Sequence, residues 1–393
     1  MFEQLQALPA DPILGLSAAY QQDTNPLKVD LGVGVYKDEQ GNTPVLSAIR
    51  KAQQRLHTEE TSKAYLPPVG PAGFNEQMQN LIFGADHTAQ QDGRVHTVQT
   101  PGGCGALRVA AELIQLAKPG ASIWVSTPTW ANHVPLLGSA GLQLKEYPYY
   151  DADTQAVNFD AMMASLEKVP AGDLVLLHGC CHNPCGTDLD QGQWQQVAEL
   201  ANKNGFTPFI DMAYQGFGDS VEEDAYGVRL LAEKVPELLV ASSCSKNFGL
   251  YRERTGAISF MGSNATNADN VKSQILKVAR GIYSMPPSHG AQLVDIVLGD
   301  SALHQQWLNE VAEMRERIKD LREALASALA STADFSFIPR QRGMFSFLGL
   351  SPLQVQRLRE EFSVYMVDSS RINIAGINQK NLAYLADSIA KVL

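Results

Sequence analysis

The chain has 393 residues, of which 45% are hydrophobic and 19% charged, and its formal net charge is −11. A chain of this length and composition is expected to bury a sizeable core and to form one large domain with a smaller one, which argues against disorder. The acidic balance, in the absence of a Lys/Arg-rich run, excludes nucleic acid and anionic membrane surfaces as partners.

The N-terminus and the cysteines indicate where the protein works. The stretch MFEQLQALPADP has an acid and a proline where a signal peptide needs positive charge and an apolar run. No apolar segment approaches membrane-spanning length. The cysteines number five, an odd count, which favours free thiols over a disulfide framework. We therefore expect a cytoplasmic protein.

Short apolar runs alternate with helical patterns through the middle of the chain. Continuously apolar runs are typical of strands buried on both faces, and the alternation predicts an α/β fold with a mainly parallel sheet and helices on both sides. The expected strands are WVSTP (124–128), DLVLLHG (173–179), TPFIDMAY (207–214), ELLVASS (237–243) and GAISFM (256–261). The expected helices are 105–117, 193–204 and a segment around 223–235.

The pattern changes near Ser301, where apolar residues recur every three or four positions from Leu303 to Leu329. This spacing predicts one long amphipathic helix. The segments FSFI and MFSFLG, a helix near 352–362, the segment VYMVDSSRINIAG and a terminal helix then predict a small α+β domain. The expected domains are an N-terminal arm with part of the small domain (1–40), the large domain (41–305) and the small C-terminal domain (306–393).

Polar side chains lie where the predicted strands end. Ligands of open α/β sheets bind outside the carboxyl ends of the strands, so one site would receive an amide, a carboxylate, a phenol and an amine. The residues at these ends are His182, Asn183, Asp211, Tyr214, Ser245 and Lys246.

Two further stretches point to a phosphate. TPGGCGALRVAA places a glycine-rich turn before a helix, whose free N–H groups favour an anion, although it is neither a P-loop nor GxGxxG and is more often structural when alone. SSCSKNFGLYRERTG places Lys246 and Arg254 in a turn between two strands. A phosphate site, a lysine and a carboxylate together suit pyridoxal phosphate, because lysine forms a Schiff base with its aldehyde and Asp pairs with its pyridine nitrogen.

The cluster HGCCHNPCG (178–186) has the composition of a metal site. On a strand, however, Cys180 and Cys181 would point to opposite faces, and no second ligand pair at zinc-finger spacing follows. We therefore expect no metal.

The motifs taken together resemble one family along nearly the whole chain. The segments VDLGVGVYKDEQG, TPGGCGALR, WANH, HGCCHNPCG, DMAYQGF, SSCSKNFGLY, RERTGA and SSRINIAG resemble the class I aspartate and aromatic aminotransferases, which are pyridoxal-phosphate enzymes of fold type I. The resemblance implies a large domain with a mainly parallel seven-stranded sheet and transamination between an amino acid and 2-oxoglutarate. Aspartate is the expected donor, with tyrosine and phenylalanine beside it; the alternative is a primarily aromatic aminotransferase.

The resemblance also implies the residues that hold the cofactor and carry the chemistry. Lys246 would be the Schiff-base lysine and general base, and Asp211 would pair with the pyridine nitrogen while His133 orients it. Asn183 and Tyr214 would bond the phenolic oxygen. The remaining cofactor contacts would come from Trp130, which stacks on the ring, and from the phosphate ligands Gly103, Cys104, Ser243, Arg254 and Tyr65.

The substrate contacts follow from the same resemblance. Arg371 would bind the α-carboxylate, Arg280 a side-chain carboxylate, and Gly34 would lie over the substrate, beside Trp130 and Asn183. In the family Tyr65 and Arg280 come from the neighbouring subunit, which implies a homodimer with shared sites.

The sequence departs from the family pattern at three positions, and it argues against two other classes of protein. Cys104 stands where the family often has Ser or Thr, Cys185 where it has Thr, and Ser370 where it has Gly. A nucleotide-binding oxidoreductase would need a dinucleotide fingerprint, which is missing. A catalytically inactive binding protein would have little reason to keep every polar group of the site.

Overall fold

The structure is a computed structural model that describes residues 1–7 and 12–393. The chain forms two compact units. The smaller unit comprises Met1–Thr43, Pro184–Gly186 and Arg317–Leu393, and the larger unit comprises Pro44–Asn183 and Thr187–Glu316. The domain limits expected from the sequence (1–40, 41–305 and 306–393) stay a prediction.

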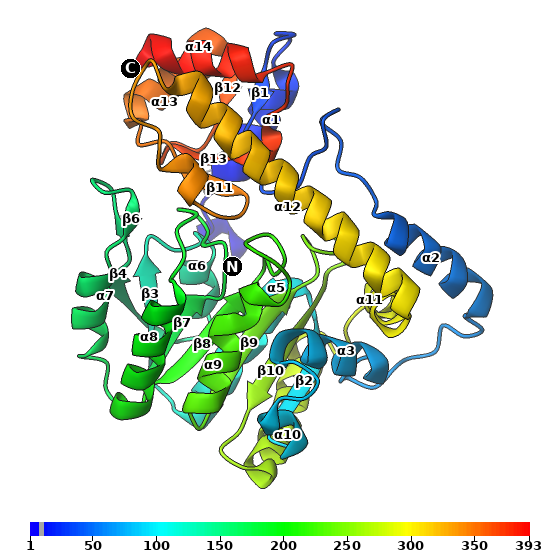
Figure 1. Ribbon diagram of the computed structural model, residues 1–393. Coiled ribbons are helices and arrows are strands. Elements are labelled where there is room, and N and C mark those ends of the chain that lie inside the picture. Colours follow the sequence, from blue (N-terminus) through cyan, green and yellow to red (C-terminus); the bar gives the residue numbers. More distant parts are fainter. Residues whose placement is uncertain (8–11) are drawn as a thin grey trace. The chain divides into compact units, whose positions relative to one another are not determined.

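The larger unit is built on a seven-stranded sheet with the strand order β2-β10-β9-β8-β7-β3-β4 (Figure 1). β10 pairs antiparallel with β2 and β9, and every other pair is parallel, which confirms the predicted mainly parallel sheet. The strands are β2 (Val95–Pro101), β3 (Ser122–Thr127), β4 (Gln143–Pro148), β7 (Leu174–His178), β8 (Thr207–Met212), β9 (Leu238–Ser243) and β10 (Thr255–Met261).

The expected strands are all present, but the two edge strands were not predicted. β4 exposes most of its side chains and β2 carries His96, Thr97 and Gln99, so neither is a continuous apolar run. β4 thus faces water as an edge strand can, whereas β2 is mostly buried but is interrupted by polar side chains, so neither has a continuously apolar pattern.

Helices cover the sheet in two groups. α5 (Gly102–Ala117) contacts α6 (His133–Gly138) and α10 (Ala265–Ile282), whereas α9 (Tyr226–Lys234) contacts α8 (Gln191–Asn204) and α3 (Ala72–Phe83). α8 begins with a capping box of Asp190 and Gln193 and ends at Gly205 in the left-handed conformation, which explains its sharp limits. The other helices of this unit are α2 (Ser47–Glu59), α4 (Thr88–Gln91), α7 (Phe159–Leu166), η2 (Glu223–Ala225) and α11 (Ser288–Gly299).

The core of the larger unit lies between the sheet and α5. Ala106, Leu107 and Ala110 of the helix belong to one buried cluster with Val98 of β2 and Ile258 of β10. Small side chains on α5 let the helix approach the strands closely, so its N-terminus is fixed at the end of the sheet.

The predicted long helix is α12 (Ser301–Leu329), and its apolar stripe is buried from Trp307 to Leu329. In the smaller unit β1 (Val29–Asp30) pairs with β12 (Val364–Tyr365), and β11 (Phe345–Phe347) pairs with β13 (Arg371–Asn373). The remaining helices of this unit are η1 (Phe2–Gln4), α1 (Pro12–Gln22), η3 (Ile338–Arg340), α13 (Pro352–Phe362), η4 (Ile374–Gly376) and α14 (Leu382–Val392). A further two-stranded hairpin in the larger unit joins β5 (Tyr150–Asp151) and β6 (Ala156–Val157).

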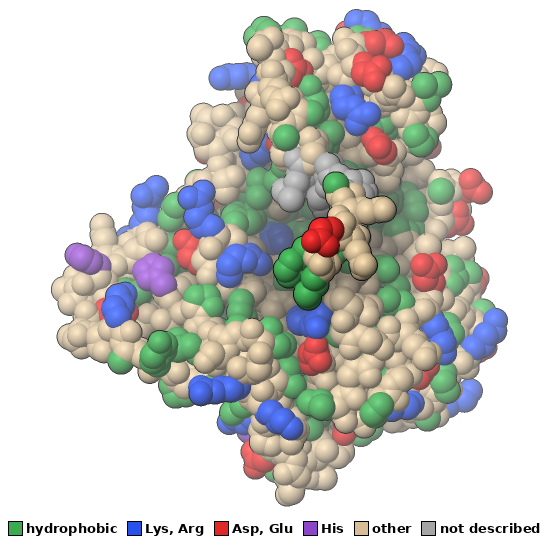
Figure 2. All heavy atoms as spheres, turned by 180° about the vertical axis from the view of Figure 1, so that it is seen from behind, with side chains coloured by type: hydrophobic (Ala, Val, Ile, Leu, Met, Phe, Trp, Pro, Cys, Tyr) green, Lys and Arg blue, Asp and Glu red, His purple; other side chains and the backbone are tan. Residues whose placement is uncertain are grey.

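The surface mixes both signs of charge. Figure 2 shows acidic, basic and hydrophobic side chains interspersed on the face turned away in Figure 1. Because both signs of charge are mixed on this face, a charged ligand must be attracted by local groups of a site.

Over residues 1–7 and 12–393, every helix is too short or too polar to cross a membrane.

Candidate active site

A buried carboxylate marks the carboxyl end of the central strands. Asp211 of β8 lies opposite His178 of β7, and Nε2 of His133, the first residue of α6, is 2.9 Å from its Oδ2. Burial alone would raise the pKa of Asp211, but the hydrogen bond with His133 and the charges of neighbouring groups, Lys246 among them, together outweigh burial and lower it. Asp211 is therefore held as an anion that can pair with a cationic ligand group.

Two further imidazoles, His178 and His182, stand behind this carboxylate. The Thr129 hydroxyl lies 2.8 Å from Nδ1 of His133 and 3.3 Å from Nε2 of His178. The His178 ring is 4.0 Å from that of His182, which stacks at 4.2 Å on Tyr149. Burial lowers the pKa of His178 to about 3 and lowers that of His182 as well, so both rings are uncharged at neutral pH.

Lys246 lies in the turn after β9, with Nζ 4.9 Å from the centre of the Tyr214 ring. Burial lowers the pKa of Lys246, and the charge of Arg254 acts in the same direction, whereas Asp211 and Cys104 oppose it. A lowered pKa leaves a larger share of the amine unprotonated at neutral pH, and only the unprotonated form can act as nucleophile or base. The structure thus brings the predicted lysine, phenol and carboxylate into one group.

The N-terminus of α5 forms an anion site beside Lys246. Pro101 precedes the helix and provides no side-chain cap, so the first N–H groups are not satisfied by capping. A Cβ atom on Gly102 would lie 2.7 Å from Nη2 of Arg254, and one on Gly103 would lie 3.2 Å from Cβ of Ser243. Gly102 has a positive φ of 71°, which favours glycine, and the absence of side chains at 102 and 103 leaves room for Arg254 and Ser243 at the helix end.

Two other predicted residues border this anion site. Cys104 is half-buried in the first turn of α5, and its Sγ is 3.9 Å from Nδ2 of Asn132. The ring of Trp130 meets that of His133 edge to face at 5.2 Å. Both side chains therefore belong to the same end of the sheet as Asp211.

A carboxylate fixes the turn that leads to Asn183. The two oxygens of Asp188 accept hydrogen bonds from the backbone N–H groups of Cys181 (2.7 Å) and His182 (2.8 Å). Asn183 follows directly and is buried. The turn therefore holds the predicted amide in a defined position.

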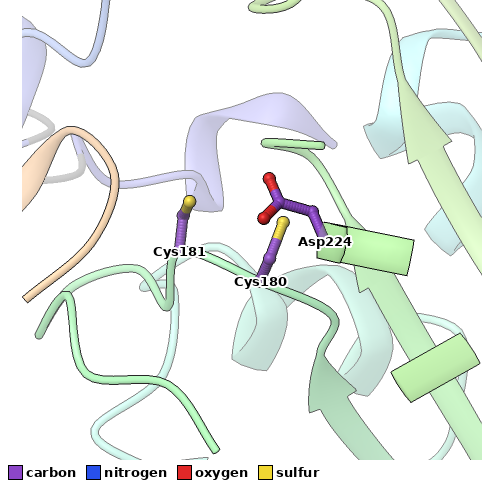
Figure 3. A group of neighbouring side chains, drawn as sticks. All are labelled: Cys180, Cys181 and Asp224. Atoms are coloured by element: carbon purple, nitrogen blue, oxygen red, sulfur yellow. The ribbon is translucent and has the colours of Figure 1, made fainter. Parts of the chain in front are cut away.

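The two adjacent cysteines correct one expectation. β7 ends at His178, so Cys180 and Cys181 lie in a turn, where Cys181 has a positive φ of 52°, and they do not point to opposite faces of a strand. Their sulfurs and a carboxylate oxygen of Asp224 all lie within 4.8 Å of one another (Figure 3). The left-handed conformation turns the second side chain back toward the first.

Asp224 has other hydrogen-bond partners. Its carboxylate accepts backbone hydrogen bonds from Gly216 (2.7 Å), Gly218 (2.9 Å) and Asp219 (2.9 Å). These bonds account for its burial without a cation. The prediction that no metal binds at HGCCHNPCG stays a prediction.

The smaller unit contains Arg371, the residue expected to bind the α-carboxylate of the substrate. Arg371 of β13 donates from Nη2 to the carbonyl of Gly32 (2.7 Å) and lies 4.4 Å from the centre of the Phe345 ring. A Cβ on Gly34 would lie 2.8 Å from Cζ of the same ring. Gly34 and Arg371 are thus neighbours around Phe345.

Tyr65 and Arg280 are not enclosed by the groups described above. The Tyr65 side chain is 94% exposed, and Arg280 is exposed in the last turn of α10. Their predicted roles in a neighbouring subunit's site stay predictions.

Sequence reasoning missed several residues that position the site. The histidine chain includes His178, and its rings are contacted by Thr129 and Tyr149. Asp188 fixes the turn before Asn183. His178 ends an expected strand and so carried a signal of its own, since polar groups at strand ends face ligands. Thr129 and Tyr149 contact histidines of distant segments, which no local pattern reveals, whereas Asp188 accepts bonds from residues six and seven positions before it.

A mainly parallel sheet, a helix N-terminus at its carboxyl end and a lysine beside a buried carboxylate define an α/β enzyme that binds a phosphorylated cofactor. The model of the family "Aminotransferase class I and II" matches residues 26–389. The chain belongs to this family, and the alternative of a nucleotide-binding oxidoreductase is therefore wrong.

Relatives match the chain over its full length. The chain is 49% identical to aspartate aminotransferase of Haemophilus influenzae, with all of both chains covered, and 48% identical to aromatic-amino-acid aminotransferase of Pseudomonas aeruginosa, with 100% and 98% covered. The crystal structure of aromatic-amino-acid aminotransferase from Burkholderia pseudomallei, covalently bound to pyridoxal phosphate, has a TM-score of 0.98, 45% identity and coverage of 100% and 99%. The predicted fold type is confirmed.

Proposed function

We propose that this aminotransferase uses pyridoxal 5′-phosphate to move an amino group between aspartate, tyrosine or phenylalanine and 2-oxoglutarate. The observation that carries the proposal is the group formed by Lys246, Asp211 and the N-terminus of α5. The donors fit each part of the cofactor, because an anion site, an amine and a buried carboxylate suit a phosphate, an aldehyde and a pyridine nitrogen.

The residues have distinct tasks in this proposal. The first turn of α5, with Gly103, Cys104, Ser243 and Arg254, holds the phosphate, and Asp211 holds a proton on the ring nitrogen, oriented by His133. Asn183 and Tyr214 bond the phenolic oxygen, and Trp130 covers the ring. The bound cofactor supplies an electron sink for the charge left when the substrate loses its α-proton. Lys246 takes that proton and returns it as general base and acid.

Two arginines select the substrate in this proposal. Arg371 binds the α-carboxylate in a two-pronged fork, with Gly34 close by, and Arg280 pairs with the distal carboxylate of a dicarboxylic acid. The exposure of Arg280 and Tyr65 supports their contribution to a neighbouring subunit, and hence a homodimer. A primarily aromatic aminotransferase is the second candidate, since relatives of both names match equally well.

We also place the enzyme in the cytoplasm in this proposal. All five cysteines are free thiols, which suits a reducing compartment. Fractionation of cells with an antibody to the protein would test this location.

Removal of Lys246 tests the proposed chemistry. Purified wild type should be yellow, and borohydride should bleach it and add the cofactor mass to the peptide that contains Lys246. Lys246→Ala should still bind the cofactor through its phosphate and ring contacts while turnover falls by several orders of magnitude. The matched control is Lys234→Ala, an exposed lysine at the end of α9, which should behave as wild type.

Substantial turnover of Lys246→Ala, or borohydride labelling elsewhere, would overturn the assignment. Rates for aspartate, tyrosine and phenylalanine with 2-oxoglutarate, measured side by side, then decide between the two candidate donor classes.

A further inference from the structure

We propose that Cys180 and Cys181 form a dithiol site that binds trivalent arsenic, taken up as arsenous acid. The two sulfurs belong to adjacent residues and lie, with an Asp224 oxygen, within 4.8 Å of one another. The positive φ of Cys181 brings both side chains to the same side of the turn, as Figure 3 shows. Small rotations of the two side chains allow one atom to bridge the sulfurs.

The surroundings of the sulfurs favour arsenic over a divalent metal. Cys180 contacts Sδ of Met212 at 3.8 Å, and Cys181 lies 4.0 Å from the carbonyl oxygen of Tyr214, so the buried thiols lie beside one soft sulfur and one backbone acceptor. The hydrogen bond with Cys181 and burial raise the pKa of Cys180 well above its usual value. Zinc would have to displace thiol protons that are held tightly, and it needs further ligands.

Arsenous acid reacts with neutral thiols, so the tightly held thiol protons need not be removed beforehand. In As(OH)₃ + 2 RSH → (RS)₂AsOH + 2 H₂O, two As–O and two S–H bonds break while two As–S and two O–H bonds form. No electron is transferred and no net proton is released, so the raised pKa of Cys180 does not oppose the reaction. The acid is small and uncharged at neutral pH, and it can enter when the turn opens transiently.

Asp224 completes the site without acting as a metal ligand. Its carboxylate is held by three backbone N–H groups of residues 216–219, and one oxygen lies near the sulfurs. This oxygen can accept a hydrogen bond from the remaining As–OH group, which a buried hydroxyl requires. The site therefore offers two sulfurs and one acceptor to a three-coordinate arsenic.

Arsenic at this position would act on the turn that carries Asn183. Cys181 is followed by His182 and Asn183, and Asp188 holds the same turn through backbone hydrogen bonds. A bridge between the sulfurs fixes the turn in a new geometry. We expect arsenite to slow the enzyme as well as to bind it.

Arsenic content of the holoenzyme tests the proposal directly. After incubation with arsenite and gel filtration, inductively coupled plasma mass spectrometry should find about one arsenic atom per wild-type chain, released by 2,3-dimercaptopropanol but not by an equal concentration of a monothiol. Cys180→Ser and Cys181→Ser should each retain less than about a tenth of that amount. Cys244→Ser is the matched control, because Cys244 is also buried and contacts a methionine sulfur at 3.8 Å, and it should bind as wild type.

Peptide mapping provides a second measurement that does not depend on the variants folding. In wild type unfolded briefly with iodoacetamide, prior arsenite should protect Cys180 and Cys181 from alkylation and leave Cys104 and Cys244 labelled. Absence of arsenic in wild type, equal binding by the serine variants, or stoichiometric zinc in the protein as purified would overturn the proposal.

Discussion

Ser370 shows how one side chain offsets backbone strain next to a substrate-binding residue. It precedes Arg371 and has a positive φ of 66°, a conformation that favours glycine, the usual residue of the family at this position. Its hydroxyl, fully buried, accepts a hydrogen bond from the N–H of Leu350 at 3.1 Å. The serine thus adds a bond between β13 and the segment after β11 that glycine could not provide.

Substitutions at Ser370 should separate strain from hydrogen bonding. Ser370→Ala leaves the Leu350 N–H buried without its acceptor and keeps the strain, so the free energy of unfolding should fall by about 1–3 kcal/mol. Ser370→Gly loses the same bond but relieves strain, and should be more stable than the alanine variant by about 1 kcal/mol. Urea denaturation measures both; equal losses would show that strain at residue 370 does not matter.

The histidine chain behind Asp211 makes the stability of the larger unit depend on pH. His178 is neutral in the folded protein because burial lowers its pKa from 6.5 to about 3, and the groups that face it are Asp211, His133 and His182. The unfolded chain binds a proton below pH 6.5 that the folded chain does not. The contribution of neutral His178 to the free energy of unfolding is therefore fully present above pH 6.5 and is lost as the pH falls from 6.5 toward 3.

This linkage should be visible in a variant without the imidazole. Each such histidine contributes a slope of up to about 1.4 kcal/mol per pH unit, so between pH 6.5 and 5 the wild type should lose about 2 kcal/mol through His178 alone. His178→Gln should lose correspondingly less over that range in urea titrations. The same exchange at the exposed His57 of α2 is the matched control. Identical slopes for wild type and His178→Gln would contradict the assignment of a buried neutral ring.

The strands around these histidines also show what a sequence alone reveals. β7, β8 and β9 are continuously buried and were predicted to within a few residues, and the parallel order then placed Asp211 and Lys246 at one edge of the sheet. The contact between His133 and Asp211 joins residues 78 positions apart, so it was predictable only through the family resemblance. The turn at Cys181 was misjudged because a left-handed cysteine has no sequence signal.

For the whole molecule, the decisive question is whether Arg280 acts within its own chain or in the site of the neighbouring subunit that we propose. The residue is exposed in the last turn of α10, so a role within its own chain would be a surface ion pair worth under about 1 kcal/mol. A role in a neighbouring site instead leaves a buried substrate carboxylate unpaired on truncation, a loss of about 2–5 kcal/mol. Arg280→Ala should accordingly lower kcat/KM for aspartate by about 30-fold to several thousand-fold, and that for phenylalanine by about tenfold or less.

Mixing two variants that are each inactive toward aspartate should reveal a shared site. Lys246→Ala lacks the base, and Arg280→Ala lacks the distal carboxylate ligand. In a hybrid dimer of the two, one site combines both defects, whereas the other takes Lys246 from one chain and Arg280 from its partner and is intact. Equal mixing after denaturation and refolding makes about half the dimers hybrids with one good site of two, so aspartate turnover should recover to about a quarter of the wild-type value.

Controls distinguish this recovery from other causes. Each variant refolded alone should stay inactive toward aspartate, and adding the second variant without denaturation should restore activity only as fast as subunits exchange. If both residues act within one chain, every site in the mixture carries one defect, and aspartate turnover cannot exceed the average of the two parents. That outcome would refute the shared site, because hybrid dimers restore function only when each chain completes the site of the other.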